Sequence, residues 1–155
     1  MEIGLLGKAC VFTLATFFFH GCVNTHYDRS ENFRFSWKIG DFKSAATEAE
    51  KLSQSGPKRD RLLYKLEEGS VKRLAGDLDG SVMALQEASA EYDRWFGVHL
   101  KTEARVSEAF SSVVGSAEWK PYKSRVYERV MMRIYQALNY LQLDEKGRAR
   151  AEIFK

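Results

Sequence analysis

Few residues of this 155-residue chain have the type and spacing that chemistry at a site requires. Of the three histidines, His20 is expected to leave with an N-terminal leader, and His26 and His99 stand alone without the spacing of a ligand set, so no metal and no cofactor is expected. The carboxylates Glu67-Glu68 and Glu48/Glu50 are expected on solvated helix faces and not as an acid–base pair. No catalytic residue is predicted, and the chain is not expected to be an enzyme. The thiol of Cys22, directly after an apolar segment, remains as a candidate for covalent modification.

The segment before Cys22 predicts an export signal over residues 1–21. Its apolar run, residues 9–19, follows Lys8. Because a membrane-spanning helix needs roughly 20 apolar residues, this run is typical of the core of a signal peptide. The segment ends in Phe19-His20-Gly21, which resembles the lipobox of bacterial lipoproteins, although that motif usually has Leu and a small residue in the first two places.

The lipobox resemblance implies that the chain is cut before Cys22 and that the thiol then carries a lipid with fatty acyl chains such as palmitate. Several acyl chains hold a protein durably on a bilayer, because each buried methylene contributes roughly 0.8 kcal/mol. Residues 22–30 are then the lipidated cysteine and a polar tether. An uncleaved signal anchor, a plain secretory signal and a cytosolic protein with two ordinary cysteines are left open as alternatives.

Composition and charge describe an ordinary globular domain. The formal net charge is only +3, and basic and acidic residues are interleaved, so no nucleic-acid partner is predicted. Removal of the leader also removes Cys10, which leaves Cys22 without a partner for an intramolecular disulfide. With prolines only at Pro57 and Pro121, long helices are permitted between them.

The remainder, residues 31–155, is predicted to be a helical repeat domain. Apolar residues recur at helical spacing in segments that predict helices over 42–52, about 60–75, 78 to about 96, and 127–141, with a weaker helix over 106–115 and another from 148. Leu85 and Leu138 are both expected in the core, where truncation to Ala costs roughly 2–5 kcal/mol.

Three turn signals recur in similar contexts along this domain. They are Gly40-Asp41-Phe42, Gly76-Asp77-Leu78 and Asp144-Glu145-Lys146, each with a small residue three positions after its last member. The first two are 36 residues apart, close to the roughly 34-residue period of tetratricopeptide repeats. The predicted fold class is therefore all-α, built from tetratricopeptide-like helical hairpins that form a short α-solenoid.

Several short runs also resemble a family of uncharacterised bacterial lipoproteins with tetratricopeptide-like repeats. The runs that carry the resemblance are residues 59–64, 74–77, 121–122, 127–129, 137–141 and 148–152. The resemblance implies a helical-repeat fold and an envelope location, and it supplies no activity. Members of the family are longer, so incompleteness at the C-terminus is left open.

A group of large apolar side chains is predicted on the concave face lined by the first helix of each hairpin. The group comprises Leu63, Leu66, Met131, Ile134, Leu138 and Leu141. Soluble monomers seldom expose so large an apolar patch. We therefore expect a partner-facing groove, covered by residues 97–120, by further chain or by a partner; the alternative is that these residues belong to the core.

These observations predict an envelope lipoprotein, lipid-anchored and expected on the outer membrane facing the periplasm. Stacked helical hairpins present an extended surface, so the expected role is to bind or assemble other envelope proteins or peptides. The alternative is an enzyme or accessory subunit that acts on the cell wall, which would need a polar cleft with convergent ionisable groups.

Overall fold

The structure is a computed structural model that describes residues 25–96 and 121–155. The predicted signal peptide, Cys22 and the weak helix predicted over 106–115 lie outside the described residues.

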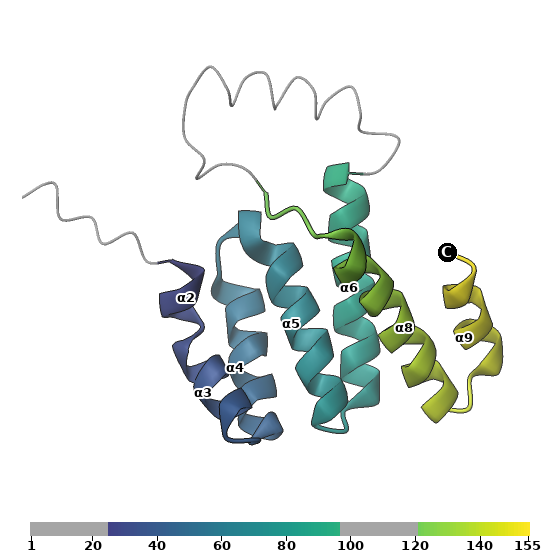
Figure 1. Cartoon of the computed structure of the whole chain (residues 1–155), viewed down its shortest axis with the longest axis horizontal. Coiled ribbons are helices and arrows are strands. Elements are labelled where there is room, and N and C mark those ends of the chain that lie inside the picture. Colours follow the sequence, from purple (N-terminus) through teal and green to yellow (C-terminus); the bar gives the residue numbers. More distant parts are fainter. Residues whose placement is uncertain (1–24, 97–120) are drawn as a thin grey trace, which may run out of the picture.

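The described parts of the chain contain helices and no strand, which confirms the all-α prediction. Figure 1 shows the helices side by side in chain order, from α2 and α3 at one end to α9 at the other. Consecutive helices pack as hairpins, and each hairpin packs against the next. The elements are α2 (His26–Arg29), α3 (Glu31–Lys38), α4 (Phe42–Ser55), a short 3-10 turn η2 (Lys58–Asp60), α5 (Arg61–Leu74), α6 (Leu78–Phe96), α8 (Val126–Gln142) and α9 (Lys146–Ile153).

The three predicted turns have the same geometry, each closing one hairpin. Each contains one residue with positive φ: Gly40 at 79°, Gly76 at 84° and Asp144 at 58°. Glycine adopts this conformation without a steric cost, and aspartate tolerates it. In each turn, the backbone N–H of the residue that follows the one with positive φ donates to a carbonyl in the last turn of the preceding helix. The N···O distances in the three turns, in chain order, are 3.0, 2.9 and 2.7 Å. The small residues predicted after the turns, Ala45, Ser81 and Ala149, are all buried.

The helical body begins earlier than residue 31. Thr25 caps α2, and its N–H donates to the carboxylate of Asp28 at 2.9 Å. The ring of His26 stacks on Tyr64 of α5, with 5.3 Å between ring centroids, and Ser30 is fully buried. Residues 25–30 of the predicted tether are therefore packed onto the fold.

A buried ion-pair network, and not a solvated carboxylate, occupies the middle of α5. Glu68 is 3% exposed, and its two oxygens each lie 2.8 Å from an ammonium, those of Lys65 and Lys72. Glu87 of α6 lies 2.9 Å from Lys65, and Glu50 of α4 lies 3.3 Å from Lys72. Burial alone would raise the pKa of Glu68, but the two ammonium groups hold it below its usual value.

Helix α8 packs on the rest of the fold through a mixed face. Met132 packs in the same cluster as Leu85, which is fully buried as predicted. Gln136, Asn139 and Tyr140 are also buried on this face. The prediction that Leu138 is a core residue is wrong, since its side chain is 39% exposed. The polar face of α8 forms hydrogen bonds with α5 and α6, and the apolar face that carries Leu138 is therefore turned outward.

Candidate functional site

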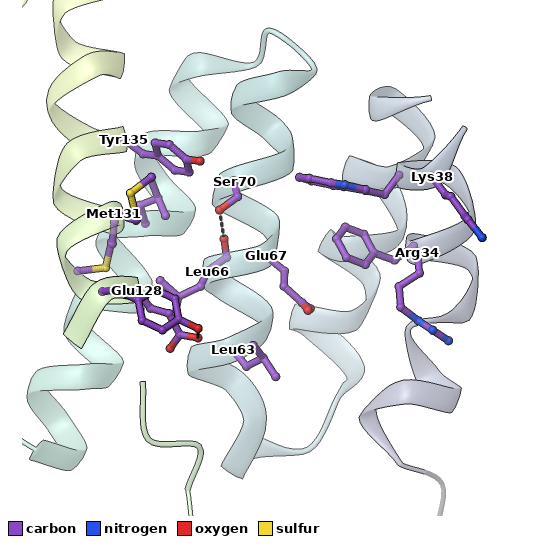
Figure 2. A pocket seen from close by; sticks show the side chains of 14 residues that line it. Arg34, Lys38, Leu63, Leu66, Glu67, Ser70, Glu128, Met131 and Tyr135 are labelled. Atoms are coloured by element: carbon purple, nitrogen blue, oxygen red, sulfur yellow. Dashed lines mark hydrogen bonds between the residues drawn. The ribbon is translucent and has the colours of Figure 1, made fainter. Parts of the chain in front are cut away.

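An apolar groove lies between α3 and α8, with α5 as its floor. It has a volume of about 570 Å³. Figure 2 shows Leu63, Leu66, Glu67 and Ser70 along α5, with Met131 and Tyr135 on α8 to one side and Arg34 and Lys38 on α3 to the other. The remaining lining residues are Phe33, Trp37, Leu85, Tyr127, Glu128 and Met132.

Helical periodicity explains why these side chains meet in the groove. Tyr127, Met131 and Tyr135 follow one another at intervals of four residues, so they line up along one side of α8. On α3, Phe33 and Trp37 have the same spacing, and their ring centroids are 5.8 Å apart. The groove therefore has aromatic side chains on both walls, joined on the α8 side by two methionines, Met131 and Met132.

The two carboxylates of the groove already have partners within the fold. Glu67 Oε2 lies 3.2 Å from His26 Nε2, and this hydrogen bond raises the pKa of His26 although partial burial opposes it. Glu128 accepts hydrogen bonds from the hydroxyl of Tyr122 at 2.8 and 2.9 Å and from the backbone N–H of Arg125 at 2.7 Å. Burial, together with this carboxylate, raises the pKa of Tyr122.

The two cations of the groove lack such partners. Among the described residues, neither Arg34 nor Lys38 forms an ion pair. Arg34 is held in place by the backbone of Tyr27, whose carbonyl accepts a hydrogen bond at 2.9 Å, and its guanidinium lies 3.3 Å from the centroid of the Tyr27 ring. Asp28 nevertheless lies within electrostatic reach of Arg34: the pKa of this carboxyl is lowered first by its hydrogen bonds with Thr25 and further by the Arg34 guanidinium.

The structure brings only part of the predicted partner-facing set together. Leu63, Leu66 and Met131 line the groove. Ile134 instead lines a second hollow of about 530 Å³ between α6, α8 and α9. Leu138 and Leu141, exposed on the surface of α8, line neither hollow.

The exposed residues of α8 nevertheless form one continuous apolar stripe, which we call the α8 seam. Its members are Tyr127, Met131, Ile134, Leu138 and Leu141, which are between 39% and 58% exposed. They follow one another at intervals of four, three, four and three residues, the spacing by which helices pair in coiled coils. The seam extends about 21 Å along the helix, at 1.5 Å per residue, and its first two members also line the groove.

Sequence reasoning missed the contribution of α3 and the polar contacts of α8. The i, i+4 pair Phe33 and Trp37 was the available signal for a groove wall on α3. On α8, Arg129 bonds to the Tyr92 hydroxyl and Arg133 donates to Ser89 Oγ at 3.0 Å. These arginines attach α8 to α6, which leaves the α8 seam free.

Comparisons with protein-family models, with curated proteins and with solved structures found no match for this chain. Within residues 25–96 and 121–155, no cluster of histidine, cysteine and carboxylate side chains could hold a metal ion. None of the helices in these two ranges is long and apolar enough to cross a membrane.

Proposed function

We propose that this protein is a lipid-anchored lipoprotein of the bacterial envelope whose helical hairpins bind peptide segments of other envelope proteins. The observation that carries the binding role is the apolar groove between α3, α5 and α8, which continues into the exposed α8 seam. Large contiguous apolar surfaces on monomers mark interaction sites. Concave sites lined by aromatic and apolar side chains are the usual binding sites of proteins.

The tetratricopeptide-like arrangement is part of the same proposal. It is supported by the three turns with positive φ and by the small buried residue that follows each of them. In such a stack the first helices of the hairpins, here α3, α5 and α8, share one face. A shared face of this kind presents the extended surface on which repeat proteins bind their partners.

We place the protein on the outer membrane, facing the periplasm, with Cys22 as the anchor. This step rests on the leader, since residues 9–19 are apolar and Gly21 precedes the cysteine. Mass spectrometry of the mature protein tests it: an acylated Cys22 at the amino terminus is expected. A product that retains Met1, or an unmodified thiol at residue 22, would contradict it.

A binding role fits the groove better than a role as a cell-wall enzyme. Glu67 and Glu128 are its carboxylates, and each is already bonded to a neighbouring side chain. A catalytic cleft would instead present ionisable groups that converge on one point.

Photo-crosslinking in the envelope tests the binding role. A photoreactive side chain at position 131 lies in the groove, and one at position 83 of α6 is a matched control, because Met83 is 63% exposed and lies outside both hollows. Position 131 is expected to give a discrete adduct with an envelope protein, while position 83 does not. Identical adducts from both positions, or none from position 131, would contradict the proposal.

A further inference from the structure

We infer that the outer side of α3 lies on the phospholipid surface of the membrane, with Phe35 and Ile39 in contact with lipid. The inference rests on the proposed lipid anchor at Cys22 and adds which face of the helical body meets the bilayer. Two observations carry it: the short stretch of chain between Cys22 and the fixed part of α2, and the exposed apolar pair on α3.

The helical body is fixed in place from Thr25 onward, only three residues after Cys22. Thr25 caps α2 through reciprocal hydrogen bonds with Asp28. His26 holds α2 on α5, since its ring stacks on Tyr64 and its Nε2 also bonds to α5. Because an extended chain advances at most about 3.6 Å per residue, the Cα atoms of Cys22 and Thr25 are at most about 11 Å apart. Acyl chains on Cys22 therefore hold α2, and α3 directly after it, at the membrane surface.

Helix α3 has apolar side chains on two sides, and only one of these sides packs on the fold. Phe33 is buried against residues of α4, and the ring of Trp37 lies 5.7 Å from that of Phe42, centroid to centroid. Phe35 and Ile39 come two positions after Phe33 and Trp37, so they lie about 200° around the helix from them. Their side chains are 64% and 62% exposed. The outer side of α3 therefore presents an apolar pair that no described residue buries.

The position of α3 in the fold makes this pair unusual. Figure 1 shows α2 and α3 at one end of the row of helices, and α3 packs mainly on α4. The terminal helices of repeat proteins ordinarily have a polar outer face, which keeps the stack soluble. Helices that lie in a membrane interface instead bury aromatic and aliphatic side chains at the boundary between headgroups and acyl chains. A bilayer held within reach by the anchor is thus a surface that covers Phe35 and Ile39.

The charges of α2 and α3 are compatible with a lipid surface but do not determine the contact. These two helices carry three cations and two carboxylates, namely Arg29, Arg34, Lys38, Asp28 and Glu31. Figure 2 shows Arg34 and Lys38 pointing away from the groove. Such long side chains lay their aliphatic stems along apolar surface and keep their charged ends in the headgroup region. The excess of one cation is small, so the contact depends on the apolar pair and the short link to Cys22.

The test measures how close the outer side of α3 lies to lipid in the acylated full-length mature protein. Acylated Cys22 has no free thiol and Cys10 leaves with the leader, so an introduced cysteine is the only site for a fluorescent label. Asn32→Cys carries a nitrobenzoxadiazole label beside Phe35 and Ile39. Met83→Cys, on exposed α6, is the matched control. Mass spectrometry of each protein first establishes that Cys22 is acylated.

Both labelled proteins are reconstituted in vesicles of phosphatidylethanolamine and phosphatidylglycerol, with or without a lipid that carries a spin-label quencher. We expect the quencher lipid to reduce the fluorescence at position 32 and to leave the fluorescence at position 83 unchanged. Iodide, a quencher dissolved in the water, is expected to show the reverse order.

A variant of the apolar pair separates the contact of α3 from the anchor. Phe35→Glu combined with Ile39→Glu is expected to abolish lipid quenching at position 32, because carboxylates remain in water. The acylated variant should still co-sediment with the vesicles. Both replaced side chains are exposed, so its circular dichroism spectrum is expected to match that of the wild type. Met83→Glu is expected to leave lipid quenching at position 32 unchanged.

Equal lipid quenching at positions 32 and 83, or quenching at position 32 that survives the double substitution, would overturn the inference and leave the anchor intact. Protection from iodide at position 32 without lipid quenching would also overturn it, since protein would then cover this side of α3. An unmodified Cys22 in a chain that does not sediment with vesicles would overturn both the anchor and the inference.

Discussion

The side-chain amide of Asn139 on α8 donates a hydrogen bond to the hydroxyl of Ser81 on α6, 2.8 Å away and 58 residues earlier in the chain. The same hydroxyl donates to the backbone carbonyl of Gly69 on α5 at 2.6 Å, and Arg73 of α5 bonds to the amide oxygen of Asn139. Both Ser81 and Asn139 are fully buried. Three helices from two hairpins thus meet at one satisfied polar contact, which fixes the orientation of α8.

Ser81→Ala is expected to destabilise the protein by about 1–3 kcal/mol, because it leaves the buried amide of Asn139 without its acceptor. Urea unfolding followed by circular dichroism measures the change. In a double-mutant cycle with Asn139→Ala, the double variant should lose less stability than the sum of the two single losses, by at least about 0.5 kcal/mol. Ser36→Ala is the control, because this serine makes no side-chain hydrogen bond among the described residues. Additive losses would show that the contact does not couple the two hairpins.

Glu68→Gln is expected to cost about 2–3 kcal/mol at neutral pH, because Lys65 and Lys72 then lose their shared buried carboxylate. Glu87 and Glu50 remain beside the two ammonium groups, which keeps the loss below that of an isolated buried charge. Chemical denaturation at pH 7 measures this difference.

The pH dependence of stability provides a second test of the same carboxylate. The folded-state pKa of Glu68 is lowered, so its stabilising contribution is present above the ordinary value of 4.5 and is lost as pH falls through the folded value. The difference in unfolding free energy between wild type and Glu68→Gln should therefore become smaller as the pH is lowered from neutral to about 3. Glu48→Gln, which removes an exposed pair with Lys51, should change stability by less than about 1 kcal/mol. A gap that stays constant with pH would contradict the buried ion-pair network.

His26 is expected to titrate above its ordinary pKa of 6.5, because Glu67 stabilises the imidazolium. The stabilising contribution of a raised pKa is fully present below 6.5 and is lost as pH rises through the folded value. A titration of the ring protons by NMR, assigned with His26→Gln, measures the pKa. In Glu67→Gln the pKa should fall, since burial then acts without the carboxylate. The same pKa in wild type and Glu67→Gln would show that α2 does not pack on α5 in solution.

The hairpin turns and most helix bounds could be predicted from the sequence, because local chemistry determines them. Gly40 and Gly76 each precede an aspartate that begins the next helix, and the small residues Ala45 and Ser81 allow that helix to pack closely. The helix predicted over about 60–75 is observed as α5, Arg61–Leu74. These features depend on residues a few positions apart.

The orientation of α8 could not be predicted in this way. Periodicity shows which residues share a face, but an apolar face is ordinarily assigned to the core. Here the hydrogen-bond partners of the polar face are distant in sequence: Gln86 donates to the Tyr140 hydroxyl at 2.7 Å, and Arg73 donates to Gln142 at 3.0 Å. Only the tertiary arrangement shows that these contacts satisfy the polar face. The helical spacing in the sequence therefore predicted that Leu63, Leu66 and Met131 lie together. It did not predict that Leu138 would lie outside both the groove and the core.

Leu85→Ala and Leu138→Ala distinguish the buried face from the exposed face. Leu85 is fully buried beside Leu62 and Met132, so its truncation is expected to cost about 2–5 kcal/mol. Leu138 is 39% exposed, and its truncation should cost less than about 1 kcal/mol. Urea unfolding of both variants measures the contrast. Similar large losses at the two positions would mean that α8 is rotated in solution so that its apolar seam faces inward.

Gly69→Ala and Gly147→Ala form a matched pair that tests how closely α5 approaches α6. A methyl group on Gly69 would lie 2.5 Å from Cγ and Cδ2 of Leu85, so this buried leucine must shift, at a cost of about 1–3 kcal/mol despite the better helix propensity of alanine. A methyl group on Gly147 in α9 meets no other atom within 4 Å, so the same substitution should stabilise by up to about 1 kcal/mol. The thermal and urea unfolding midpoints of the two variants should therefore shift in opposite directions from those of the wild type. Stabilisation by both substitutions would show that α5 and α6 pack less closely than the 2.5 Å approach between Gly69 and Leu85 requires.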